Sequence, residues 1–294
     1  MFYYSENCSK KYEGYFKSNL CDYIGTQYSK TGQIIYKGGF KNNLWNSKGI
    51  FYDEQGFVKY SGAWKDSKRE GKGKGFYKDS NQVEYDGYWN KDARDGKGVS
   101  YYPNGVIKYD GYWSQSKYDD HGVIYDEFGL KDFEGFFINS MKNGHGTKYN
   151  KFGDVFLCGK WTADILTDYE LSIEEEAKGF QVLKCGDKYQ MYIGQTLDDV
   201  PHGEGFFINT LTGFKQSEGM YKFGKTDGFL KWFYAVEEPI LKFSGQSENG
   251  LINGKGRFYF VNGKMKYQGY WKQNFANFGF GVEFDESGCI KKIK

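Results

Sequence analysis

A short motif of the form aromatic-x-Gly-x-aromatic returns along the chain at a nearly constant interval. The clean copies are centred on Gly14, Gly38, Gly62, Gly87, Gly111, Gly135 and Gly269, and looser copies are centred on Gly159, Gly194, Gly219 and Gly245. Successive central glycines lie 24 to 26 residues apart, except for one interval of 35 residues between Gly159 and Gly194. Eleven copies in phase predict a repeat protein in which each copy is one supersecondary unit.

A second glycine follows most copies of the motif at a fixed offset. It lies eleven residues after the central glycine in eight copies, at Gly25, Gly49, Gly73, Gly98, Gly122, Gly146, Gly205 and Gly256. Because side chains alternate along a strand, the two aromatics and the glycine of the motif share one face. The glycine leaves a gap that a ring from a neighbouring strand can enter. Each repeat is therefore predicted to be a β-hairpin of about 24 residues, marginal alone and stable when stacked.

The composition favours a β-rich chain with an aromatic core. The sequence has 27 Tyr, 26 Phe, 7 Trp and 41 Gly but only 3 Pro, and its aliphatic residues are sparse. Aromatic residues favour strands and can supply much of the buried apolar area. The net charge is +2 with both signs interspersed. No nucleic-acid partner is expected, because no long basic block is present.

Features that would direct the chain to a membrane or to secretion are not expected. No apolar stretch approaches 18 residues, and the first residues lack a basic region followed by an apolar run. The five cysteines are scattered without a C-x-x-C pair, which argues against a disulfide framework or a zinc site. An intracellular location in a reducing compartment is therefore predicted.

Two stretches carry a family resemblance. Residues Gly87 to Gly105 and Tyr267 to Gly281 combine the motif with the later Gly-x-Gly and turn glycine, and they resemble the MORN repeat. The resemblance covers nearly the whole chain. It implies an all-β fold, an elongated single-layer antiparallel array of about eleven hairpins. We therefore expect residues 1–294 to form a single array without a fused catalytic domain. Such arrays occur in radial-spoke-head, cytoskeletal and junctional proteins, and beside lipid-kinase or methyltransferase domains.

The 35-residue interval predicts an acidic insertion. The first strand of the seventh hairpin survives at Leu157–Trp161, and the second strand is expected to resume at Gly179, which places the insertion at 162–178 within that hairpin. Ser172 and Glu175 have the spacing of a capping box, and Gly179 could end a short helix. The candidate docking residues there are Asp168, Glu170, Glu174, Glu175 and Glu176. The segment is either a docking element or a solvated surface insertion.

The two ends of the array are a second departure. Tyr4 falls in an aromatic slot of the period, and residues 290–294 fall where another strand would begin. Open β edges invite pairing with another chain. We therefore expect edge pairing with a second copy or with a partner protein.

The sequence lacks a signature of catalysis. His121, His145 and His202 each precede a second-strand glycine, which makes them repeat positions rather than catalytic or metal-binding residues. No metalloprotease, nucleophile-elbow or phosphate-loop motif is present, so no enzyme activity, metal or cofactor is expected.

Aromatic side chains on an exposed face are the remaining candidates for binding. We predict a groove for a peptide or helix along the tryptophans Trp64, Trp89, Trp113, Trp161 and Trp271. The expected function is a non-catalytic scaffold that binds other proteins of a ciliary, axonemal or other cytoskeletal assembly. Peripheral membrane or phospholipid binding is the alternative, and the near-neutral charge argues against the basic face it needs.

Overall fold

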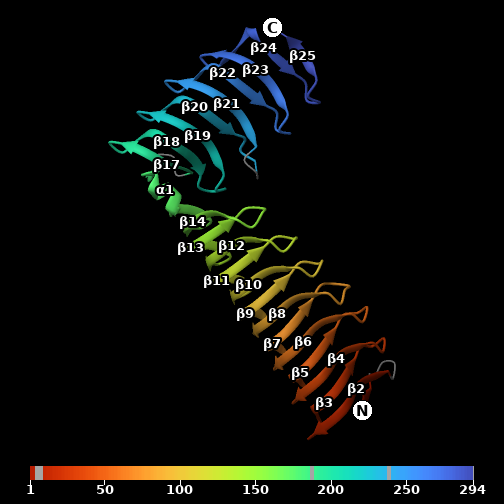
Figure 1. Ribbon diagram of the computed structural model, residues 1–294. Coiled ribbons are helices and arrows are strands. Elements are labelled where there is room, and N and C mark those ends of the chain that lie inside the picture. Colours follow the sequence, from red (N-terminus) through yellow and green to blue (C-terminus); the bar gives the residue numbers. More distant parts are fainter. Residues whose placement is uncertain (4–8, 186–188, 237–239, 294) are drawn as a thin grey trace. The chain divides into compact units, whose positions relative to one another are not determined.

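The computed structural model describes residues 1–3, 9–185, 189–236 and 240–293. The chain forms two compact units, Met1–Phe156 and Leu157–Lys294. Nearly all of the described chain is antiparallel β-sheet, with one short helix (Figure 1). The predicted all-β hairpin fold is confirmed, whereas the extent of a single array over residues 1–294 stays a prediction.

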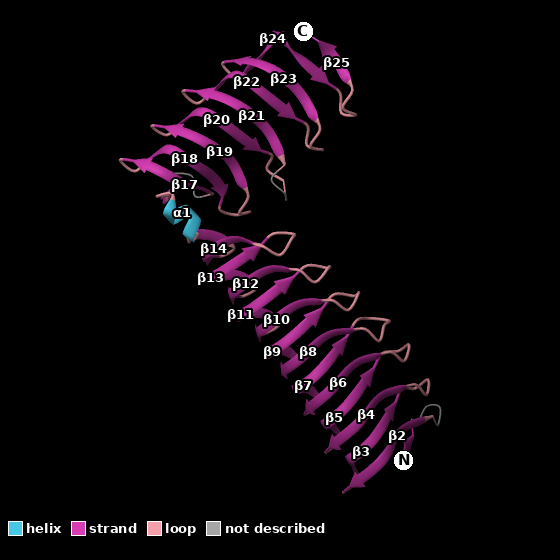
Figure 2. Ribbon diagram, in the orientation of Figure 1, coloured by secondary structure: helices cyan, strands magenta, loops and turns pink. Residues whose placement is uncertain are grey.

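The first unit is one sheet whose strands are neighbours in chain order (Figure 2). Its strands are β1 (Phe2–Tyr3), β2 (Lys10–Lys17), β3 (Leu20–Tyr28), β4 (Ile34–Lys41), β5 (Leu44–Tyr52), β6 (Val58–Lys65), β7 (Lys68–Phe76), β8 (Val83–Asn90), β9 (Ala93–Tyr101), β10 (Ile107–Ser114), β11 (Lys117–Tyr125), β12 (Lys131–Ile138) and β13 (Met141–Tyr149).

The second unit holds a paired hairpin, the helix and a sheet whose strands also follow chain order. Its elements are β14 (Val155–Thr162), which begins just before the unit boundary, β15 (Ile165–Tyr169), α1 (Ile173–Ala177), β16 (Gln181–Lys184), β17 (Gln190–Leu197), β18 (Val200–Asn209), β19 (Lys215–Lys222), β20 (Lys225–Phe233), β21 (Leu241–Glu248), β22 (Leu251–Tyr259), β23 (Met265–Lys272), β24 (Phe275–Phe284) and β25 (Ile290–Ile293).

In most hairpins the motif occupies one strand and the second glycine occupies the other, as predicted. In β6 and β7, the central Gly62 lies directly opposite Gly73, and the same glycine pairing recurs in the neighbouring hairpins. A two-residue turn, Asp66-Ser67, joins the strands with φ angles of 48° and 62°. Left-handed values at both positions are typical of a type I′ turn, whose twist matches that of the strands.

The ring of the first aromatic residue of the motif, a tyrosine or phenylalanine, packs against each glycine pair. The ring of Tyr60 lies against Gly62 and Gly73, and a β-carbon at Gly73 would come within 2.2 Å of the phenol oxygen. That hydroxyl donates a hydrogen bond to the carbonyl oxygen of Ala63 at 2.9 Å. The predicted gap beside the central glycine is therefore filled by a tyrosine of the same hairpin. Tyr60 lies on the same strand as Gly62 and on the strand next to Gly73.

The second aromatic of the motif joins consecutive hairpins. The Trp89 ring packs edge-to-face against Tyr85 of its own strand at 5.2 Å and against Tyr60 of the preceding hairpin at 5.4 Å between centroids. Its indole N–H donates to the carbonyl oxygen of Gly73 at 3.0 Å. Aromatic pairs of this geometry contribute about 0.5–1.5 kcal/mol beyond the buried area. The repeats are thus held together by an alternating ladder of Tyr and Trp rings.

The tight turns form a second link between hairpins. The hydroxyl of Ser67, in the β6–β7 turn, accepts a hydrogen bond from the backbone N–H of Trp45 at 3.0 Å, and the Ser67 N–H donates to the Trp45 carbonyl at 2.9 Å. Asn43 and Asp92 make the same two bonds to the hairpins before them. These three turns are therefore bonded to the start of the preceding hairpin's second strand.

The seventh hairpin differs from its prediction. The partner of β14 is β15, with Gly159 opposite Tyr169 and Trp161 opposite Leu166, so the expectation that the second strand resumes at Gly179 is wrong. A two-residue turn, Ala163-Asp164, closes the hairpin before the helix begins, and the side chain of Leu166 lies beside Gly159 where a tyrosine ring lies in other hairpins. Residues 162–178 accordingly contain β15 and α1, and β16 pairs with β17.

Candidate interaction surfaces

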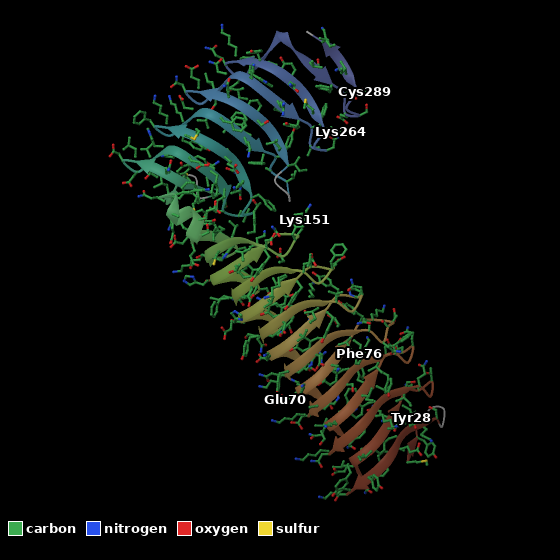
Figure 3. All side chains as sticks on the ribbon, in the orientation of Figure 1. Tyr28, Glu70, Phe76, Lys151, Lys264 and Cys289 are labelled. Atoms are coloured by element: carbon green, nitrogen blue, oxygen red, sulfur yellow. The ribbon has the colours of Figure 1, made fainter. Side chains whose placement is uncertain are left out.

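The sheet of each unit has two different faces. The ladder face carries the Tyr and Trp rings, and the opposite face carries the residues next to each central glycine, so side chains project on both sides (Figure 3). Trp64, Trp89, Trp113 and Trp161 are buried, at 6% exposure or less. The expectation that these tryptophans line an exposed groove is wrong for those four, because the rings of adjacent hairpins cover them. Trp271 is partly buried against Tyr267 and Phe243.

Two arginines line a hollow on the ladder face between β5 and β9. The guanidinium of Arg69 lies 4.1 Å from the ring centroid of Trp89, and its Nε donates to Asp92 at 3.2 Å. Arg94 lies over Tyr85 at 5.0 Å and forms an ion pair with Glu84. Both cations are therefore neutralised and stacked within the sheet. Their side chains line the hollow, and each charge is balanced by a carboxylate of the sheet.

Exposed rings form a row on the opposite face. Tyr88, Tyr112 and Phe136 each follow a central glycine in consecutive hairpins and are 51%, 46% and 44% exposed. The side chains of Tyr88 and Phe136 lie over Gly96 and Gly144, whose φ angles are +92° and +107°. Each of these glycines is the first of a Gly-x-Gly segment. The first glycine lies beside a ring on the opposite face, and the second lies beside a ring on the ladder face.

The histidines occupy repeat positions, as predicted. His121 is exposed on the opposite face, where its ring packs edge-to-face with Phe136 at 5.4 Å. His145 is exposed one repeat further along, and the ring of His202 lies 5.1 Å from that of Phe223. Within the described ranges, no group of three or more His, Cys, Asp or Glu side chains could hold a metal ion.

Some acidic side chains of the segment form hydrogen bonds within the segment itself. Ser172 and Glu175 form the predicted capping box, and Gly179 follows the helix with a φ of +71°. The carboxylate of Glu175 also accepts a hydrogen bond from the Tyr169 hydroxyl at 3.1 Å. This carboxylate therefore stabilises the fold of the segment.

Two more acidic candidates have partners nearby. Glu174 pairs with Lys178 at 3.0 Å, and Glu170 accepts from the thiol of Cys158 at 3.1 Å. Asp168 lies on the edge strand β15, and Glu176 is exposed on α1. Docking through these residues stays a prediction.

The first and last strands pair on one side with their neighbours. β1 pairs with β2, and β25 pairs with β24, where Ile290 and Ile293 remain exposed. Tyr4, predicted in an aromatic slot, lies outside the described residues. Edge pairing with another chain stays a prediction.

Burial keeps the ladder tyrosines in their protonated form. It raises the pKa of Tyr12, Tyr60 and Tyr221 to about 12. The pKa values of Tyr36 and Tyr85 are raised still further, for the same reason. A phenol without a charge can donate its hydrogen bond to a backbone carbonyl, so the raised values belong to the structural role of these rings rather than to catalysis.

An array of antiparallel hairpins with a tyrosine–tryptophan ladder defines the chain as a β-hairpin repeat protein. The MORN repeat profile matches residues 36–56, 60–81, 85–107, 133–150 and 243–265, and each matched segment begins at a ladder aromatic. The chain thus contains five MORN repeats, as its resemblance predicts. Its described residues show no catalytic domain, and the family is generally non-catalytic.

The other comparisons add little to this assignment. No curated protein matches the chain. No helix in the described part of the chain is both long and apolar enough to cross a bilayer.

Proposed function

We propose that this protein is a non-catalytic scaffold that binds other proteins of a ciliary or cytoskeletal assembly. The observation that carries the proposal is the exposed row of Tyr88, Tyr112 and Phe136, three rings at the same position of three consecutive hairpins. The ladder on the other face already stabilises the sheet, so these rings are not needed for the core. Aromatic residues exposed in a row are typical of protein-binding surfaces.

The spacing of the row suits an elongated partner. Consecutive rings are two strands apart, which corresponds to roughly 10 Å. Seven residues of an α-helix, which make about two turns, cover about the same distance and return to the same face of the helix. A partner segment that lies along the array could therefore place one apolar side chain on each ring.

Affinity purification followed by mass spectrometry tests the proposal. The full chain is compared with the triple variant Tyr88→Ser/Tyr112→Ser/Phe136→Ser, after circular dichroism has shown that both are folded. Axonemal or cytoskeletal proteins that co-purify with the wild type and not with the variant support the scaffold function. Recovery of lipid and membrane proteins alone, together with flotation on anionic vesicles, would instead establish the phospholipid-binding alternative.

A further inference from the structure

The opposite face of β3–β7 contains a trough where the row of rings is interrupted. At the register of Tyr88 and Tyr112, the two preceding hairpins carry Gly39 and Ala63. One hollow lies over Gly39 and a second lies over Ala63, and the two share Lys48 and Ile50. The trough therefore lies where Gly39 and Ala63 stand in place of the aromatic residues found at this position in other hairpins.

The trough is lined by lysines. Lys17, Lys37, Lys41, Lys48 and Lys72 border the two hollows and are exposed. Within the described part of the chain these five form no ion pair, whereas the nearby Lys65 and Lys74 pair with Glu70 and Asp86. Asp22 is the one acidic residue in the lining. The near-neutral charge of the whole chain thus conceals a basic surface.

The walls of the trough add apolar contact. Tyr23 and Ile24 border the hollow over Gly39 and are 62% and 67% exposed. Ile50 lies between the two hollows and is half-buried. Apolar walls beside unpaired cations suit a ligand that carries both negative charge and apolar groups.

We propose that this trough binds an acidic segment of a partner protein, with its carboxylates on the lysines and its apolar side chains against Tyr23, Ile24 and Ile50. The proposal rests on the scaffold function and names the chemistry of one partner. From β3 to β7 the trough crosses four strand spacings, roughly 19 Å, which is the length of about six extended residues. A recess between exposed walls admits a single polypeptide segment more readily than the flat surface of a bilayer.

The experiment uses the full chain and a fluorescein-labelled peptide of four Glu-Glu-Leu repeats, with binding followed by fluorescence anisotropy. In a polyproline II conformation, with three residues per turn and a rise of about 3.1 Å per residue, the leucines of this peptide lie on one side and recur after about 9 Å, close to the spacing of the hairpins. We expect saturable binding, and no binding of the matching Lys-Lys-Leu peptide. Absence of saturable binding by the Glu-Glu-Leu peptide overturns the proposal and leaves the co-purification test of the scaffold function unaffected.

Two variants of the trough and one control complete the test. Ala63→Tyr fills the trough and should fold, because Gly71 faces Ala63 as Gly96 faces Tyr88: a β-carbon added to either glycine would lie 3.2 or 3.3 Å from the β-carbon of the facing residue. Lys48→Glu/Lys72→Glu reverses the charge of its lining. Each should weaken peptide binding about tenfold or more, without a change in thermal midpoint. Lys97→Glu, at the position of Lys72 one repeat further on and outside the trough, should change binding about twofold or less.

The remaining outcomes contradict the proposal. If Lys97→Glu weakens peptide binding as much as the double variant does, the peptide is held by general electrostatic attraction rather than by the trough. Unchanged binding by Ala63→Tyr would exclude the trough as the site. Phosphatidylserine vesicles that bind the wild type and not the double variant, while the Glu-Glu-Leu peptide fails to bind, would assign the lysines to a lipid surface instead.

Discussion

The phenol ring of Tyr60 lies so close to Gly73, across the strands of one hairpin, that a β-carbon on the glycine would lie 2.2 Å from the hydroxyl oxygen. The same contact recurs between Tyr36 and Gly49 and between Tyr85 and Gly98. Ring and glycine therefore act as one unit, repeated along the sheet. The glycines recur at regular spacing in the sequence because this contact requires a glycine in each repeat that makes it.

Replacing Gly73 by alanine should therefore destabilise the protein, by about 1–3 kcal/mol or more, because Tyr60 must leave its place. The control is Gly75→Ala on the same strand and face, where a β-carbon meets nothing closer than Trp89 at 3.3 Å. Phe51 and Ser100 occupy the equivalent positions of neighbouring hairpins. Chemical denaturation measures both variants, and equal losses would contradict the role given to Tyr60.

Truncation of a ladder tryptophan should act locally. Trp89→Ala removes a ring that is 5% exposed and leaves the carbonyl of Gly73 without its indole donor. The expected cost is about 3–5 kcal/mol, and it should fall on the hairpins in contact with that ring. Hydrogen exchange should then show lost protection in β6–β9 and little change in β2–β3. A uniform loss over the first unit would argue against nearest-neighbour stability.

The bond between a tight turn and the preceding hairpin can be tested at Ser67. Ser67→Ala leaves the N–H of Trp45 without its acceptor and should cost about 1 kcal/mol. Ser67→Asn should recover most of that stability, since Asn43 and Asn274 provide the same bond in their own turns. If asparagine is no better than alanine in thermal or urea unfolding, the side-chain bond does not contribute.

The ladder tyrosines should make the protein sensitive to alkali. The pKa of Tyr60 is raised to about 12 by burial, above the ordinary value near 10 that it takes when unfolded. Below about pH 10 both states keep the proton, so stability is complete. Between about pH 10 and 12 the unfolded state loses its proton first, and stability falls by about 1.4 kcal/mol per pH unit for each such phenol.

The control for this pH dependence is Tyr60→Phe. Phe133 and Phe243 occupy the same position in other hairpins, so the variant should fold. Its free energy of unfolding should fall less steeply with pH over this window than that of the wild type. If the free energy of unfolding, measured by urea denaturation at each pH, falls equally steeply in both proteins, Tyr60 ionises equally in the folded and unfolded states.

Much of the fold could be predicted because one contact imposes a visible spacing on the sequence. Gly62 and Gly73 must face each other beneath Tyr60, and this requirement reveals both strands and the hairpin between them. The type of tight turn could not be predicted, because its residues vary from Asp66-Ser67 to Gln115-Ser116 without a fixed glycine. There the geometry is imposed by the strands and the neighbouring hairpin rather than by the turn residues.

The surface was harder to predict than the core. Alternation along a strand assigns residues to two faces but does not say which face the rings of adjacent hairpins cover, and Trp89 was therefore expected to be exposed. The strand β15 escaped prediction because Gly159 faces Tyr169 there instead of a second glycine. The trough depends on residues that are small, Gly39 and Ala63, and small residues leave no signal of their own.

The two-residue turns also decide where the chain can change its length. Gly62 and Gly87 are each followed by their partner glycine after eleven residues, whereas the connection from Gly73 to Gly87 is one residue longer than that from Gly49 to Gly62. The extra residue lies in the loop between β7 and β8, away from the tight turns. Insertions therefore accumulate on one margin of the sheet, and that margin, for example the loop at Asp53–Gly56, is where a tag or reporter can be grafted without shifting the register.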